Sequence, residues 1–137
     1  MHIIETEFPD FGLTPEQRRE AVLGHYYEIP GMDGARGEIW CYTDAYAYPP
    51  GATVNLHVSA TTSRYRLEIV RDGAIETPVL SQDGLAAAWQ DTPDQCSVIG
   101  CGWPVSHAFR IGEDWPSGAY RITLTAEGRD GNPITCH

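Results

Sequence analysis

The chain has 137 residues, of which 42% are hydrophobic and 20% charged, and its formal net charge is −10. This length and composition are those of a single globular domain with one core. The acidic balance argues against nucleic acid or an anionic membrane surface as a partner, because both require clustered Lys and Arg.

The first residues, Met1 to Glu5, lack the basic and apolar regions of a signal peptide. No apolar run approaches the roughly 18 residues needed to cross a bilayer. The four cysteines are scattered along the chain, at Cys41, Cys96, Cys101 and Cys136. We therefore expect a cytoplasmic protein whose cysteines are mostly reduced.

The N-terminal residues differ in pattern from the rest. Thr14 as N-cap, Pro15 at the first helical position and Gln17 as the partner of a capping box predict the start of a short helix. A helix of this length is marginal alone, so it must dock on something. We predict a helical extension and connector over 1–37, followed by a separate domain over 38–137.

From residue 38 onward the apolar residues alternate with polar ones. A strand is expected to end at Tyr42-Thr43-Asp44, and a turn follows at Pro49-Pro50-Gly51. Alternation then predicts half-buried antiparallel strands at 54–59, 65–70, 105–111 and 120–126.

The connections between these strands carry turn residues. Ala60 to Ser63 predicts a hairpin loop, and Asp130-Gly131-Asn132 predicts a second hairpin. Residues 77–102 are less regular and hold a loop, and 133–137 begin a strand that the chain does not finish. Six or so strands with frequent turns predict a mostly β fold, an antiparallel β-sandwich of immunoglobulin- or fibronectin-like type.

Two blocks of this domain resemble one enzyme family. The first reads Tyr42-x-Asp44, Tyr48-x-Pro50-Gly51, Val54-x-Leu56-x-Val58-Ser59 and Tyr65-x-Leu67-x-Ile69-x-Arg71. The second reads Gly100-Cys101-Gly102-Trp103-Pro104-Val105 and Asp114-Trp115-Pro116-Ser117-Gly118-x-Tyr120. In this order they resemble the N-terminal β-sandwich domain of the large (beta) subunit of N,N-dimethylformamidase and its relatives, over roughly 38–137.

The resemblance implies an amidohydrolase that cleaves small N-substituted formamides. It also implies a mononuclear ferric centre, held by two Tyr and a carboxylate in a larger downstream region. None of those ligands matches a position here, so we assign no catalytic residue to this chain. Any iron is expected in the catalytic region of a larger partner chain.

Metal binding within this chain is considered for Cys96, Cys101, Cys136 and His137. A mononuclear site needs three or four convergent ligands, whereas the cysteine spacing here is not that of paired CxxC motifs. A zinc or iron site, a disulfide, and unmodified buried or loop thiols are the three alternatives. We therefore expect no cofactor in the chain itself.

Histidine and tyrosine side chains are the other candidates for chemistry. His107 alternates with apolar residues, which favours a hydrogen-bonded core histidine over a ligand or base, and His57 is expected to point outward. Tyr42, Tyr46 and Tyr48 lie near Asp44, and we expect packing aromatics and a carboxylate that accepts backbone N–H groups.

The bend around Trp103 is the last of these features. Gly100 and Gly102 predict a tight bend with positive φ, and Trp103 is expected to plug the core. Cys101 would act as a catalytic thiol only in an environment that lowers its pKa.

These observations favour a non-catalytic structural or interaction subunit of a dimethylformamidase-like amidohydrolase, which packs on a larger catalytic chain. The expected interface comprises Tyr26, Tyr27, Pro133, Ile134 and His137. Residues 133–137 should lie at a sheet edge, where an uncovered strand is an aggregation hazard.

Two other functions stay open. A stand-alone β-sandwich module could bind a carbohydrate or a protein if Trp40, Tyr46 and Trp89 are exposed. A small metalloenzyme would use the Cys and His residues named above.

Overall fold

The computed structural model describes residues 14, 17 and 35–137. The chain divides into two compact units, Met1–Met32 and Asp33–His137. This division falls a few residues before the predicted boundary between 37 and 38. The units are described separately below.

In the first unit, Thr14 and Gln17 exchange two hydrogen bonds. The Thr14 backbone N–H donates to Gln17 Oε1 at 2.9 Å, and the Gln17 N–H donates to Thr14 Oγ1 at 3.1 Å. This reciprocal pair is the predicted capping box. The rest of the predicted helix and connector, with Tyr26 and Tyr27, lies outside the described residues.

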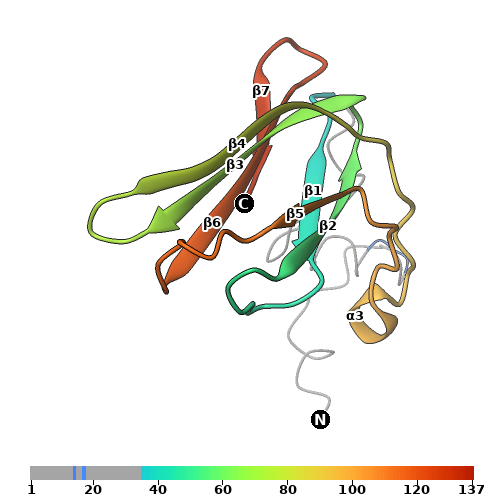
Figure 1. Cartoon of the computed structure of the whole chain (residues 1–137). Helices are drawn as coiled ribbons and strands as arrows, with labels where there is room; N and C mark the ends of the chain where they lie inside the picture. Colours follow the sequence, from blue (N-terminus) through green and yellow to red (C-terminus); the bar gives the residue numbers. More distant parts are fainter. Residues whose placement is uncertain (1–13, 15–16, 18–34) are drawn as a thin grey trace, which may run out of the picture. The chain divides into compact units, whose positions relative to one another are not determined.

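The second unit is a β-sandwich of two antiparallel sheets, as predicted (Figure 1). The first sheet has the order β1 (Ile39–Thr43), β2 (Thr53–Ala60), β5 (His107–Arg110). The second has the order β4 (Thr77–Ala86), β3 (Arg64–Asp72), β6 (Ala119–Glu127), β7 (Pro133–Cys136). A short helix, α3 (Cys96–Ile99), lies between β4 and β5. Within the part of the chain that the structure describes, no helix is long and apolar enough to cross a membrane.

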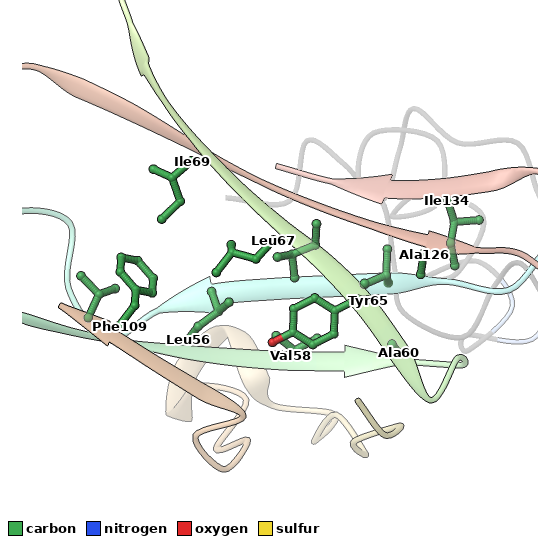
Figure 2. Packing of buried hydrophobic residues seen from close by; sticks show 12 residues of the cluster. Leu56, Val58, Ala60, Tyr65, Leu67, Ile69, Phe109, Ala126 and Ile134 are labelled. Carbon is green, nitrogen blue, oxygen red and sulfur yellow. The ribbon is translucent and has the colours of Figure 1, made fainter. Parts of the chain in front are cut away.

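The core lies between the sheets and is built from alternate residues of each strand (Figure 2). The side chains of Leu56, Val58, Leu67 and Leu124 are fully buried there. Burying an aliphatic side chain of this size contributes roughly 1.5–3 kcal/mol. The two-residue period of β2, β3 and β6 therefore encodes which face of each strand turns inward.

Two parts of the predicted topology are wrong. The loop at 61–63 joins β2 in one sheet to β3 in the other, so it crosses between sheets and is not a hairpin. The region 77–102 contains the strand β4, which the sequence did not predict. Most of its residues are exposed or half-buried, and its pairing with β3 has register shifts, so no regular alternation marks it.

The turns of the chain follow glycine chemistry as predicted. Gly51 has φ +77°, and the Ala52 N–H donates to Pro49 O, which closes a Pro-Gly turn before β2. Between β6 and β7, Gly131 has φ +80°, and its N–H donates to Gly128 O at 3.0 Å. The second predicted hairpin is thereby confirmed.

Tyr65 lies in the core with its hydroxyl buried and without a hydrogen-bond partner (Figure 2). Burial, and then the charge of Cys41, raise the pKa of Tyr65 to about 12. An unpaired buried hydroxyl costs about 1–3 kcal/mol of stability.

We therefore predict that Tyr65→Phe raises the free energy of unfolding by about 1 kcal/mol. Urea unfolding followed by fluorescence measures the change. Leu67→Ala, at a fully buried neighbour on β3, is the control and should cost about 2–5 kcal/mol. A destabilised Tyr65→Phe variant would show that the hydroxyl has a stabilising partner.

Candidate functional site

An unpaired strand edge is the main feature of the sandwich surface. β7 pairs with β6 only over 124–127, whereas β6 begins at Ala119. On its other side β6 pairs with β3 over 119–125. No described residue pairs with 119–123 on the β7 side, and Figure 1 shows the C-terminus part-way along β6.

The register shows which backbone groups this edge presents. The Gly128 N–H donates to Asn132 O at 2.8 Å, so residues 128 and 132 are a hydrogen-bonded pair. In an antiparallel ladder such pairs recur at every second residue, which makes 126/134 and 124/136 the next ones. The N–H and C=O groups of Ile122 and Tyr120 therefore point to the same side, beyond the end of β7.

A hollow of about 330 Å³, here called the edge slot, lies between this edge and the first sheet. Cys41, Thr43 and Leu56 line it from the first sheet. Tyr120 and Ile122 line it from β6, and His137 lies at the end of β7. The edge slot thus combines free backbone hydrogen-bonding groups with a mostly apolar wall.

His137 holds the end of β7 against β6. Its Nδ1 lies 3.0 Å from Thr123 Oγ1, within hydrogen-bonding distance. Of the other predicted interface residues on β7, Pro133 is exposed and, by the register above, its nitrogen faces outward, where an edge strand tolerates a missing donor. The side chain of Ile134 is instead buried in the chain's own core, so it cannot face a partner as predicted.

A second hollow of about 530 Å³, here called the end cleft, adjoins the edge slot at one end of the sandwich. The two share Thr43, Ala119, Tyr120 and Ile122. The turn before β2 and the loop before β6 wall the end cleft with aromatic rings. Among these, Trp115 and Tyr120 stack with their centroids 5.5 Å apart, while Tyr46 is fully exposed.

The two sequence blocks of the family resemblance meet at this end of the fold. The turn around Tyr48 and Pro50 comes from the first block, and the loop with Trp115, Pro116 and Tyr120 comes from the second. They are far apart in the sequence but line the same end cleft. Residues of both blocks therefore line the end cleft, which is open to solvent.

Asp44 ties the turn before β2 to that strand. Its Oδ1 accepts hydrogen bonds from the Tyr48 hydroxyl and from the Asn55 N–H, and Oδ2 accepts from Asn55 Nδ2. The bond from Tyr48 is the main cause that holds the pKa of Asp44 below its ordinary value. Asp44 therefore accepts a backbone N–H as predicted, although from β2 instead of from the turn.

The three tyrosines near Asp44 do not converge on a common point. The Tyr48 hydroxyl binds Asp44, and Tyr46 is exposed. The Tyr42 hydroxyl accepts a hydrogen bond from the backbone N–H of Trp103 at 3.1 Å. Burial, followed by the hydrogen bond to Asp44, raises the pKa of Tyr48. Tyr42 and Tyr48 have the predicted packing and turn roles, whereas Tyr46 is fully exposed, so its prediction as a packing aromatic is wrong.

The outer face of the first sheet carries a separate aromatic cluster. Tyr42 stacks on His57 with centroids 4.6 Å apart, and Trp103 packs on Tyr42 at 5.3 Å. His57 points outward as predicted, but its Nδ1 bonds Trp103 O at 2.8 Å. Trp103 is buried on this outer face and does not belong to the core between the sheets, which corrects its predicted place.

The bend that carries Trp103 has the predicted backbone. Gly100 has φ +81° and Gly102 has φ +67°, both in the region that favours glycine. The bend brings Trp103 back over β1 and β2, where its carbonyl and N–H bind His57 and Tyr42.

The four cysteines lie in two pairs, Cys41 with Cys136 and Cys96 with Cys101. Cys136 lies against Cys41, with 3.0 Å between the two Sγ atoms. Burial, and then the neighbouring Cys96 thiol, raise the pKa of Cys101. Within the described residues no group of three or more His, Cys, Asp or Glu side chains gathers to hold a metal ion.

His107 bridges the two sheets. Its Nε2 lies 2.7 Å from Gln82 Oε1, which comes from β4 of the opposite sheet. A half-buried, hydrogen-bonded histidine fits the predicted structural role.

Sequence reasoning missed the two residues that matter most to the edge slot. Tyr120 and Ile122 were predicted only as residues of a half-buried strand. The alternation of 120–126 predicts which side chains point inward, and it carries no signal for the backbone pairing of that strand.

No protein-family model matches the chain, and no curated protein or solved structure is significantly similar to it.

Asp44 gives the site a pH dependence that can be tested. Because the pKa of Asp44 is lowered in the folded chain, its carboxylate stabilises the fold above its ordinary pKa, about 3.9. That contribution is lost as the pH falls through the folded pKa. We predict that Asp44→Asn lowers Tm at neutral pH and that its difference from the wild type closes below about pH 4.

Thermal unfolding between neutral pH and about pH 2 measures this difference. Asp91→Asn, at an exposed loop position, is the matched control and should follow the wild type throughout. A gap between Asp44→Asn and wild type that stays constant at acid pH would contradict the assignment.

Proposed function

We propose that this chain is a non-catalytic interaction subunit or domain of a dimethylformamidase-like amidohydrolase, and that it packs on a larger catalytic chain. Two sequence blocks support the kind of enzyme by their resemblance to its N-terminal domain. The observation that carries the interaction role is the unpaired edge of β6 over 119–123 beside the apolar edge slot.

Strand addition is the binding mode that this edge supports. An extended segment of the partner lies along β6 in line with β7 and exchanges hydrogen bonds with the backbone of Tyr120 and Ile122. Alternate side chains of that segment enter the edge slot toward Leu56. The partner thereby covers an edge that would otherwise promote aggregation.

Catalysis in this proposal belongs to the partner. The larger chain holds the iron and cleaves the amide of small N-substituted substrates, and this chain contributes surface and stability. We place the assembly in the cytoplasm, where the four free thiols of this chain stay mostly reduced.

The edge slot can be blocked without touching the core. Ala119 is exposed and lines both hollows, so Ala119→Lys places a charge at their junction. We predict that this variant binds the partner at least about tenfold more weakly, because the Lys side chain fills the junction and desolvating its charge costs more than the roughly 1.4 kcal/mol of a tenfold change.

The matched control is Ala108→Lys, at an exposed alanine on β5 that lines neither hollow. The tagged chain is purified from its source cells, the bound chain is identified and quantified, and N,N-dimethylformamide hydrolysis is assayed in the eluate. The proposal predicts a stoichiometric larger chain and hydrolysis for wild type and control. A chain that elutes alone, or a complex that leaves the amide intact, would refute it.

A second function is favoured by the exposed aromatic surface. Tyr46 is fully exposed at the end cleft and Trp89 is 39% exposed, although Trp40 is half-buried. A stand-alone module could use such rings to bind a carbohydrate or a protein ligand. Calorimetry with soluble oligosaccharides separates the two functions: binding that Tyr46→Ala abolishes and the control Ala108→Lys preserves would favour this module.

A further inference from the structure

Cys41 and Cys136 join the free edges of the two sheets. Cys41 lies on β1, an edge strand of the first sheet, and Cys136 lies on β7, an edge strand of the second. The two residues are 95 positions apart in the sequence, yet their Sγ atoms are 3.0 Å apart. Both thiols are half-buried between the sheets.

This geometry is close to that of a disulfide. A disulfide bond is about 2.05 Å long, so the two sulfur atoms must approach by about 1 Å. Each strand is hydrogen-bonded to a neighbour on one side only among the described strands, β1 to β2 and β7 to β6. The edge strands can therefore make this small adjustment without disturbing the central strands of either sheet.

We propose that Cys41 and Cys136 form a reversible disulfide between the sheets, made by exchange with a small-molecule disulfide that enters through the edge slot. Cys41 lines the edge slot, so a reagent in that hollow can reach it. The proposal does not rest on the amidohydrolase partner, although a partner strand in the edge slot would cover Cys41.

The exchange has two steps. The Cys41 thiolate attacks one sulfur of the small-molecule disulfide, whose own S–S bond breaks, and one small thiolate leaves. The Cys136 thiolate then attacks Cys41 Sγ and displaces the second small thiolate. The protein loses two electrons and two protons, and two small-molecule thiols carry them away.

The order of attack follows from the contact between the thiols. The hydrogen bond from Cys136 lowers the pKa of Cys41, although burial works in the opposite direction. The same contact, followed by burial, raises the pKa of Cys136. Cys41 is thus the first thiolate and Cys136 the thiol that resolves the mixed disulfide.

Cross-linking closes a long loop and ties β7 to β1 at the wall of the edge slot. Restricting the unfolded chain over so many residues favours the folded state. The second cysteine pair, Cys96 and Cys101, lies on α3 and the bend after it, within the connection between β4 and β5.

The test uses the full chain with Cys96→Ser and Cys101→Ser, which leaves Cys41 and Cys136 as the two remaining thiols. After incubation with oxidised glutathione, peptide mapping should find Cys41 linked to Cys136. The Tm should rise by roughly 10 °C and return on reduction. The circular dichroism of the reduced variant confirms that it is folded.

The matched controls carry Cys41→Ser or Cys136→Ser in the same background. Each should gain one glutathione, with Tm below that of the cross-linked protein. Glutathione on both thiols without a Cys41–Cys136 linkage, or no reaction in a folded protein, would overturn the proposal. A linkage that forms without any rise in Tm would equally refute the stabilising cross-link.

Discussion

The unequal coverage of β6 is the constraint on which the surface of this sandwich depends. Fully buried residues of β2, β3 and β6, such as Leu56, Leu67 and Leu124, hold the two sheets face to face. This packing fixes β6 as the strand between β3 and β7. Among the described residues β7 covers β6 only over 124–127, and 119–123 have no backbone partner on that side. The edge slot lies beside this uncovered stretch.

The edge slot and the end cleft form one continuous surface at the end of the sandwich. Tyr120 belongs to both, since its backbone lies on the free edge and its ring stacks on Trp115. Cys41 lines the edge slot and touches Cys136 on β7. An added partner strand would lie beside Cys41 in the edge slot. Binding of that strand and oxidation of the Cys41 thiol would therefore affect each other.

The sequence predicted the features that side-chain periodicity and turn chemistry determine. The sandwich and its inward faces follow from alternation in β2, β3 and β6, and the turns follow from Gly51 and Gly131. The alternation of apolar and polar residues does not show which distant strands pair. The sequence therefore predicted neither strand β4 nor the passage of the chain from one sheet to the other between β2 and β3. The contact of Cys41 with Cys136 is likewise a product of tertiary packing, which local spacing does not reveal.

Amide hydrogen exchange at the free edge of β6 tests the account most directly. In the isolated chain, the amides of Tyr120 and Ile122 should exchange quickly, because no described strand accepts from them, whereas the Leu124 amide, paired with β7, should be protected. In a complex with the proposed larger chain, Tyr120 and Ile122 should become protected as well. Unchanged fast exchange of these two amides in that complex would contradict strand addition at the edge slot.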